Sequence, residues 1–170
     1  MIKIKIFTLL LLISSCAQSN KLIQAPVGSE SLAPEVKVFS SYKVSVPENL
    51  ADENSVFVKP VIKYWNDSIG EELFGDTGFP IEVKYVESLP NEFDYAAAIA
   101  WRSPTDCKIE IKHEYNAIKN LLNLIAHEFG HCIGFNHSTF DQSIMWFESF
   151  RTQKITTEIK RIIESNKVQN

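Results

Sequence analysis

Residues 127–137 read HEFGHCIGFNH, and the rest of the chain must be arranged around them. Residues four apart on a helix lie about one turn apart on the same face, so His127 and His131 can direct two imidazoles at one ion. Gly134 comes three residues after His131, where a glycine at positive φ can end the helix and turn the chain. That turn allows His137 to return as a third nitrogen ligand. Three protein ligands leave a tetrahedral zinc ion with one open position, as in a catalytic site.

Glu128 supplies the acid–base group that such a site needs. It is one step round the helix from His127, so its carboxylate can act as a base on zinc-activated water. The plainer alternative is an ordinary amphipathic helix with surface histidines, which a bare HExxH often is. The extended pattern fixes five residues over eleven positions, and coincidence explains it poorly. We therefore expect one catalytic zinc ion.

Together with the run HSTFDQSIMW at 137–146, the motif resembles that of the metzincin metallopeptidases, whose signature is this longer motif followed by a methionine turn. Met145 falls eight residues after His137, and Ser138 directly follows that histidine. Both features are similar to the matrixin branch. The resemblance implies three histidine ligands, His127, His131 and His137, and a hydrophobic base beneath them formed by Met145.

A metzincin-like chain is expected to be a zinc-dependent endopeptidase acting on a peptide or protein substrate, with Glu128 as general base. The alternative is a non-catalytic zinc-containing envelope lipoprotein that binds peptides or protein partners. The presence of Glu128 argues against it, because a binding site needs no base. A lipid-anchored structural protein without zinc is a third possibility. Structural calcium is not supported, since no acidic cluster has clear calcium-loop spacing.

The order of predicted elements matches the α+β fold that the resemblance implies. That fold is a metzincin-like catalytic domain with a small, twisted, mostly parallel sheet, an antiparallel edge strand, a first helix, a zinc helix and a C-terminal helix. β-Branched and alternating runs predict strands, and apolar stripes predict helices. We expect a strand at 36–46, a helix at 56–73, strands at 81–86, 95–101 and 107–112, the zinc helix at 117–133 and a last helix at 156–165.

The apolar spacing also predicts which helix faces are buried. The inward residues are expected to be Val58, Ile62, Trp65 and Ile69 in the first helix, Ile118, Leu122, Ile125 and Phe129 in the zinc helix, and Ile159, Ile162 and Ile163 in the last.

The strand at 95–101 matters for substrate binding. In matrixins an edge strand above the cleft pairs with an extended peptide, and Ala98, Ile99 and Ala100 are the best match by position. Small side chains would let a peptide backbone approach closely. It is equally plausible that the alanines pack beneath a neighbouring helix.

The residues after Met145 leave the specificity pocket open. Matrixins typically place a proline and a tyrosine in its wall, but no proline occurs here, so Phe147 and Phe150 are only candidates. Those phenylalanines and Trp146 are equally explained by packing. His113, outside the motif, is expected to be a solvated surface residue.

Two cysteines besides Cys16 remain for pairing, an even number in an exported protein. We expect a Cys107–Cys132 disulfide that joins a strand to the zinc helix. The competing interpretation makes Cys132 a metal ligand, although it lies about 100° round the helix from His131.

The N-terminus has the features of an export signal. Residues 1–15 combine two lysines with an apolar run too short to span a bilayer, and they end beside Cys16 in a pattern that resembles a bacterial lipobox. We expect lipidation of Cys16, a flexible tether over 16–35 and the catalytic domain over 36–170. Ala17 after the cysteine favours the outer membrane of the cell envelope. The alternative is an ordinary secretory signal with an incidental cysteine.

Composition limits the remaining classes of function. The net charge is −4 and no basic run exceeds two residues, so nucleic-acid binding is poorly supported. The length suits one domain with a single core, and we expect a monomer.

Overall fold

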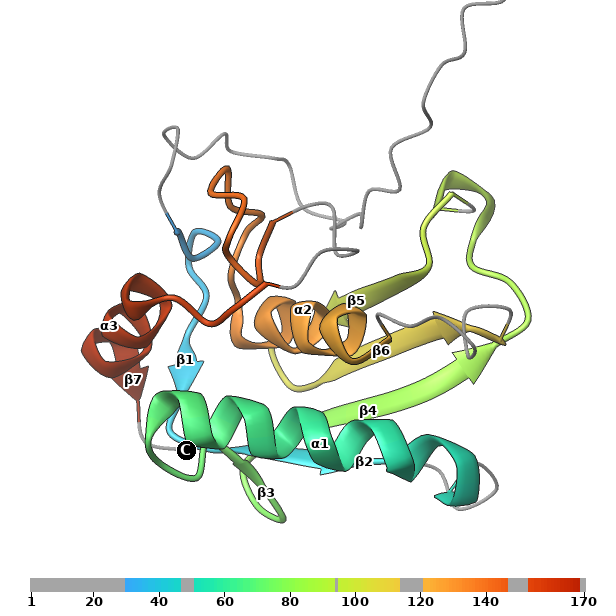
Figure 1. Cartoon of the computed structure of the whole chain (residues 1–170), viewed down its shortest axis with the longest axis horizontal. Helices are drawn as coiled ribbons and strands as arrows, with labels where there is room; N and C mark the ends of the chain where they lie inside the picture. Colours follow the sequence, from blue (N-terminus) through green and yellow to red (C-terminus); the bar gives the residue numbers. More distant parts are fainter. Residues whose placement is uncertain (1–29, 47–50, 94, 114–120, 147–152, 169–170) are drawn as a thin grey trace, which may run out of the picture.

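A mixed sheet and three helices form the described part of the molecule (Figure 1). The computed structural model describes residues 30–46, 51–93, 95–113, 121–146 and 153–168. In chain order the elements are β1 (Val38–Phe39), β2 (Tyr42–Ser45), α1 (Ala51–Ile69), β3 (Phe74–Gly75), β4 (Phe79–Val86), the 3-10 turn η2 (Asn91–Phe93), β5 (Ala98–Arg102), β6 (Cys107–Lys112), α2 (Leu121–Ile133), α3 (Thr157–Asn166) and β7 (Lys167–Val168).

The main sheet has the strand order β3-β2-β4-β6-β5. All neighbours are parallel except β5, which lies antiparallel to β6 at the edge. The parallel strands β2 and β4 are joined through α1, as a crossover connection requires. Strands β1 and β7 form a separate parallel pair. The expected α+β fold with a mostly parallel sheet and an antiparallel edge strand is confirmed.

Helices α1 and α2 pack against each other and against the sheet. Trp65 of α1 is fully buried, and its indole Nε1 donates a hydrogen bond to the carbonyl of Ala126 in α2 at 3.1 Å. The ring of Phe129 in α2 lies 4.8 Å from that of Phe74. Burial of these large side chains is the main source of stability here, and it fixes α2 on the sheet.

The predicted apolar face of α1 is correct, but its bounds are not. Val58, Trp65 and Ile69 are buried, and Ile62 packs against the core. The helix starts at residue 51 rather than 56 and ends at 69 rather than 73. It ends where Gly70 adopts a φ of +91°, a conformation that glycine accepts without steric cost and that closes helices.

One predicted core residue of α2 is wrong. Leu122 is 44% exposed, while Leu121 and Leu124 are buried. The buried face is centred on Ile125. Leu121, four positions before it, lies on that face, whereas Leu122, three positions before it, lies at the edge of the face. Residues 114–120, where the helix was expected to start, lie outside the described residues.

The last helix agrees with the prediction. Ile159, Ile162 and Ile163 are buried, and the Thr156 side chain caps α3 by accepting a hydrogen bond from the Ile159 N–H. Of the predicted inward residues, only Ile118 lies outside the described part of the chain.

Three strand predictions differ in detail. The expected strand at 36–46 is divided into β1 and β2, because the chain turns at residues 40–41 to pair first with β7 and then with β4. The strand expected at 81–86 begins earlier, at Phe79, and the one expected at 95–101 occupies Ala98–Arg102. The strand at 107–112 has the predicted bounds.

Residues 30–35, which precede the expected start of the domain at residue 36, contact the rest of the fold. Glu30 is buried, and Leu32 forms an antiparallel bridge with Phe135. The expected signal and Cys16 lie outside the described residues. Within those residues, no helix is both long and apolar enough to cross a bilayer.

Candidate metal centre

Three imidazoles converge at the C-terminal end of α2. The Nε2 atom of His131 lies 3.1 Å from that of His127 and 3.2 Å from that of His137. One ligand nitrogen from each ring lies within 4.8 Å of the others. Nitrogen ligands on a tetrahedral zinc ion, at about 2.0–2.1 Å from the metal, are roughly 3.3 Å apart. The predicted ligand set is therefore brought together at spacings that suit zinc.

Backbone carbonyls orient two of these rings. Nδ1 of His127 lies 2.7 Å from the Ile144 oxygen, and Nδ1 of His131 lies 2.8 Å from the Phe135 oxygen. A carbonyl only accepts hydrogen bonds, so Nδ1 of each ring carries the proton and its Nε2 lone pair faces the centre. Such partners are typical of histidines that bind metal.

The three histidines are held neutral by their surroundings. Burial, with the neighbouring His137, lowers the pKa of His127 to about 3, and burial lowers the pKa of His137 to about 4. The pKa of His131 is also lowered well below its ordinary value, first by burial and then by the other two rings. Neutral imidazole is the form that binds a metal.

Gly134 makes the turn that returns His137 to the centre. Its φ is +118°, and the N–H groups of Gly134 and Phe135 both donate to the Gly130 carbonyl at 3.0 Å to close the helix. A Cβ on Gly134 would come within 2.2 Å of Val36 Cγ1. Glycine is needed here for its backbone conformation and for the space it leaves.

Met145 packs directly against α2, as a methionine turn would. It is fully buried, and a Cβ on Gly130 would lie 2.1 Å from its sulfur. The loop is tied to the third ligand by the N–H of Ser138, which donates to the Met145 carbonyl at 2.7 Å. The preceding residue, Ile144, supplies the carbonyl that orients His127.

The disulfide between Cys107 and Cys132 is confirmed, with 5.6 Å between the two Cα atoms. It joins the start of β6 to the last turn of α2, beside His131. The alternative role of Cys132 as a metal ligand is therefore wrong, because its sulfur is already bonded. With a sequence separation of 25 between the cysteines, the chain-entropy model gives a stabilisation of about 3.5 kcal/mol.

Glu128 and the edge strand lie next to this centre. Glu128 is fully buried and follows His127 on α2. Strand β5 is the last strand of the sheet, and it packs against α2. Ala98 and Ala100 are buried in the main core, while Ile99 points to a smaller cluster on the other face of the sheet. The alanines thus pack beneath a helix, as one alternative held, and the strand also lies at the edge.

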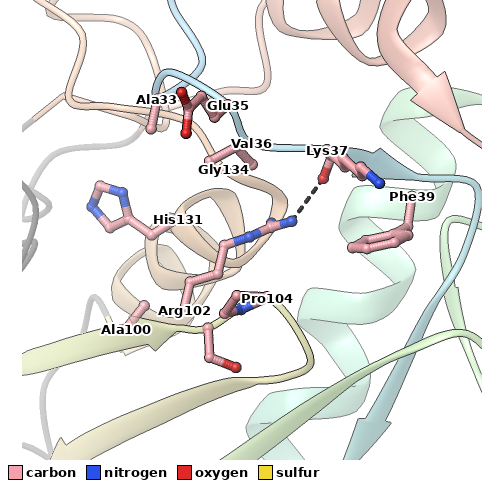
Figure 2. Close-up of a pocket in the computed structure, with 11 residues that line it drawn as sticks. Ala33, Glu35, Val36, Lys37, Phe39, Ala100, Arg102, Pro104, His131 and Gly134 are labelled. Atoms are coloured by element: carbon pink, nitrogen blue, oxygen red, sulfur yellow. Dashed lines mark hydrogen bonds between the residues drawn. The ribbon is translucent and has the colours of Figure 1, made fainter.

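A cavity of about 540 Å³ adjoins His131 (Figure 2). Its walls come from the N-terminal segment, the end of β5 and Gly134. Arg102 crosses it, donating hydrogen bonds to the Cys132 carbonyl and, at 2.7 Å, to the Lys37 carbonyl. Its guanidinium also lies 4.9 Å from the centre of the Phe79 ring. Arg102 could not be predicted from the sequence, because its partners are distant in the chain and no local pattern marks it.

The remaining predicted positions contribute less to the centre. His113 is exposed at the surface, as predicted, with Nε2 3.8 Å from a carboxylate oxygen of Glu87. Trp146 is partly buried beside Met145. The pocket-wall candidates Phe147 and Phe150 lie outside the described residues.

Comparison with known proteins agrees with this geometry. The family model for Matrixin matches residues 64–162, more than half of the chain. The chain belongs to the matrixin family. No curated protein matches it. The expected family is confirmed. Because matrixins are metallopeptidases, the cluster of His127, His131 and His137 indicates a zinc-binding site.

Proposed function

We propose that this matrixin is a zinc-dependent endopeptidase in which His127, His131 and His137 hold one zinc ion. The observation that carries the proposal is the convergence of three neutral imidazoles, two of them from the helix that also bears Glu128 and the third from the turn after it. When bound, zinc polarises a substrate carbonyl and lowers the pKa of water from about 15.7 toward about 7.

Glu128 is the general base of the proposed reaction. Its carboxylate takes the proton from the water that attacks the scissile carbonyl and delivers it to the leaving amine. Its position next to His127 and its full burial support this role, since electrostatic interactions are stronger away from bulk water. The reaction requires no covalent acyl-enzyme.

The substrate is proposed to be an extended peptide segment that pairs with the outer edge of β5. Support comes from the place of β5 at the end of the strand order and from its packing against α2. A strand added at this edge would gain backbone hydrogen bonds. The backbone of Ala98, Ile99 and Ala100 would supply them.

We also propose that the protein works in the cell envelope as a lipid-anchored monomer. The lipobox-like pattern ending at Cys16 supports the anchor. The Cys107–Cys132 disulfide supports an oxidising compartment outside the cytosol.

The test is cleavage of a mixed peptide library by the zinc-loaded protein truncated after Cys16, read by mass spectrometry. Glu128→Ala should bind one zinc per chain and lose about 10²–10⁴-fold in rate. Glu164→Ala is a matched control, because Glu164 is an exposed glutamate of α3. It should cleave like the wild type.

Two outcomes would count against the proposal. Full activity in Glu128→Ala would remove that residue as the base. Absence of cleavage by the wild type, with one zinc bound per chain, would favour a protein that binds peptides without cutting them.

A further inference from the structure

Residues 30–33 lie along the turn that carries the third histidine. The N–H of Ala33 donates to the Gly134 carbonyl at 2.8 Å, and the N–H of Asn136 donates to the Ser31 carbonyl at 2.9 Å. Leu32 is paired antiparallel with Phe135 between these two bonds. In addition, the Asn136 side-chain amide donates a hydrogen bond to the Ser31 hydroxyl at 3.2 Å. This short N-terminal segment thus holds the chain from the end of α2 to the residue before His137.

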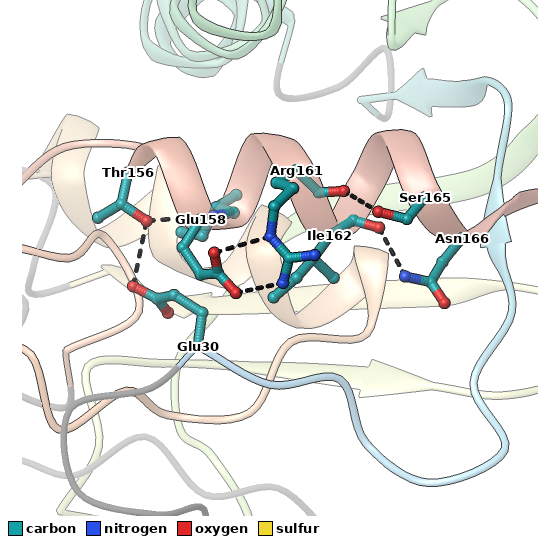
Figure 3. Close-up of polar contacts among 8 residues, drawn as sticks. Glu30, Thr156, Glu158, Arg161, Ile162, Ser165 and Asn166 are labelled. Atoms are coloured by element: carbon teal, nitrogen blue, oxygen red, sulfur yellow. Dashed lines mark hydrogen bonds and ion pairs between the residues drawn. The ribbon is translucent and has the colours of Figure 1, made fainter.

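Glu30 extends the contact to two other parts of the site. Its side chain is buried, and Oε1 accepts a hydrogen bond from the Thr156 hydroxyl at 3.3 Å (Figure 3). Thr156 is also the cap of α3. Burial raises the pKa of the Glu30 carboxyl, and the hydroxyls of Ser143, Thr156 and Ser138 oppose that rise. One oxygen of Glu30 is therefore bonded to the cap of α3, while its other oxygen, Oε2, is buried and has no hydrogen-bond partner among the described residues.

The two serines, Ser138 and Ser143, belong to the framework of the metal centre. Ser138 directly follows His137 and is tied through its N–H to Met145. The hydroxyl of Ser143 accepts a hydrogen bond from the Met145 N–H at 3.0 Å. The serine hydroxyls that oppose the rise in the Glu30 pKa thus come from both ends of the loop between the third ligand and the methionine turn.

We propose that residues 30–33 form a brace that positions His137 for zinc, with Glu30 as its main positioning residue. His137 needs such support because it lies beyond the end of α2, whereas the helix itself holds His127 and His131. Outer contacts that orient a ligand commonly contribute 10–100-fold to metal affinity. The brace rests on the proposed zinc site and not on the proposed reaction. It lies outside residues 64–162, the part matched by the family model.

The experiment compares zinc affinity among variants of the full chain, purified in detergent. Affinity is measured by competition with a chromophoric chelator, and cobalt(II) absorption reports the coordination. Glu30→Ala should weaken zinc binding about 10-fold or more and reduce the absorption of tetrahedral cobalt. Glu30→Gln keeps an oxygen for Thr156 and should lie between the wild type and Glu30→Ala. Glu164→Gln removes an exposed carboxylate and should match the wild type.

A second variant keeps the test valid if Glu30→Ala fails to fold. Ser31→Ala removes only the hydroxyl that contacts the Asn136 side chain and should weaken zinc binding a few-fold with the fold retained. Zinc dissociation constants within twofold of the wild type in both Glu30→Ala and Ser31→Ala would overturn the brace, even if melting temperatures fall. If Glu30→Ala does not fold, Ser31→Ala decides alone. Because no substrate is used, a protein that binds zinc but cuts nothing would contradict the proposed function and still test the brace.

Discussion

Gly130 and Met145 are in direct contact: a Cβ added to the glycine would stand 2.1 Å from the methionine sulfur. The glycine lies in α2 between His127 and His131, and the methionine is fully buried. The helix that bears two ligands and the loop beneath it therefore approach each other more closely than any residue other than glycine at position 130 would permit.

This contact predicts the effect of Gly130→Ala. In an exposed helix, alanine would stabilise by about 1 kcal/mol, but here the methyl group overlaps the sulfur of a buried side chain. We expect a net destabilisation of about 1–3 kcal/mol, measured by urea unfolding. Met145→Ala should reduce the cost of Gly130→Ala in the double variant. A higher unfolding free energy for Gly130→Ala alone would show that the contact is absent.

Substitution by alanine is predicted to destabilise the protein more at Gly134 than at Gly70, although both glycines have positive φ. Gly70→Ala meets no atom within 4 Å, whereas Gly134→Ala meets Val36. Gly70→Ala should cost only backbone strain, about 1–2 kcal/mol. Gly134→Ala should cost more and should also weaken zinc binding, because the turn leads to His137. Equal effects on stability and unchanged zinc affinity would refute this difference.

Reduction of the disulfide should lower stability without a change in net charge. We expect a loss of about 2–4 kcal/mol in urea unfolding when a reductant is added to the wild type. The variant carrying both Cys107→Ala and Cys132→Ala should unfold at the same midpoint with and without reductant. A wild-type unfolding midpoint that does not change when reductant is added, under conditions where free thiols are shown to form, would contradict the prediction.

The metal-free protein should lose stability as the pH falls below about 6.5. The pKa values of His127 and His137 are lowered to about 3 and about 4 in the folded state, so between pH 6.5 and 4 the unfolded chain binds more protons. The stability these histidines contribute is thus fully present above the unfolded pKa and is lost on acidification. The slope is at most about 1.4 kcal/mol per pH unit for each histidine. Urea unfolding from pH 7.5 to 5 measures it.

Replacement of one of these histidines tests the origin of the pH dependence. His137→Ala should make the slope shallower. Constant stability between pH 7 and 5 in the metal-free wild type would show that the histidines are not held neutral by the fold.

The metal site could be predicted from sequence because its information is local. Two ligands four residues apart, a glycine that ends the helix and a third ligand beyond it need no knowledge of the rest of the chain. The core of α3 and the bounds of β6 could be predicted for the same reason, since their apolar periods are regular. The Cys107–Cys132 pairing followed from the small number of cysteines available.

What could not be predicted depends on contacts between distant residues. Arg102 binds the carbonyls of Cys132 and Lys37, which are 30 and 65 residues away. Residues 30–33 have the polar composition of a linker, yet they pair with the turn after Gly134. The apolar stripe on α2 is wide and predicts that Leu122 is buried, but only packing against the sheet decides which edge of the stripe is exposed.

The most direct test of the account is peptide cleavage followed through removal and return of the metal. A chelator should abolish cleavage by the wild type, and one equivalent of zinc per chain should restore it. Glu128→Ala, loaded with the same one equivalent, should remain about 10²–10⁴-fold slower than the wild type. Cleavage that persists in the metal-free protein, or that zinc restores equally in Glu128→Ala, would contradict the proposal of a zinc peptidase with Glu128 as its base.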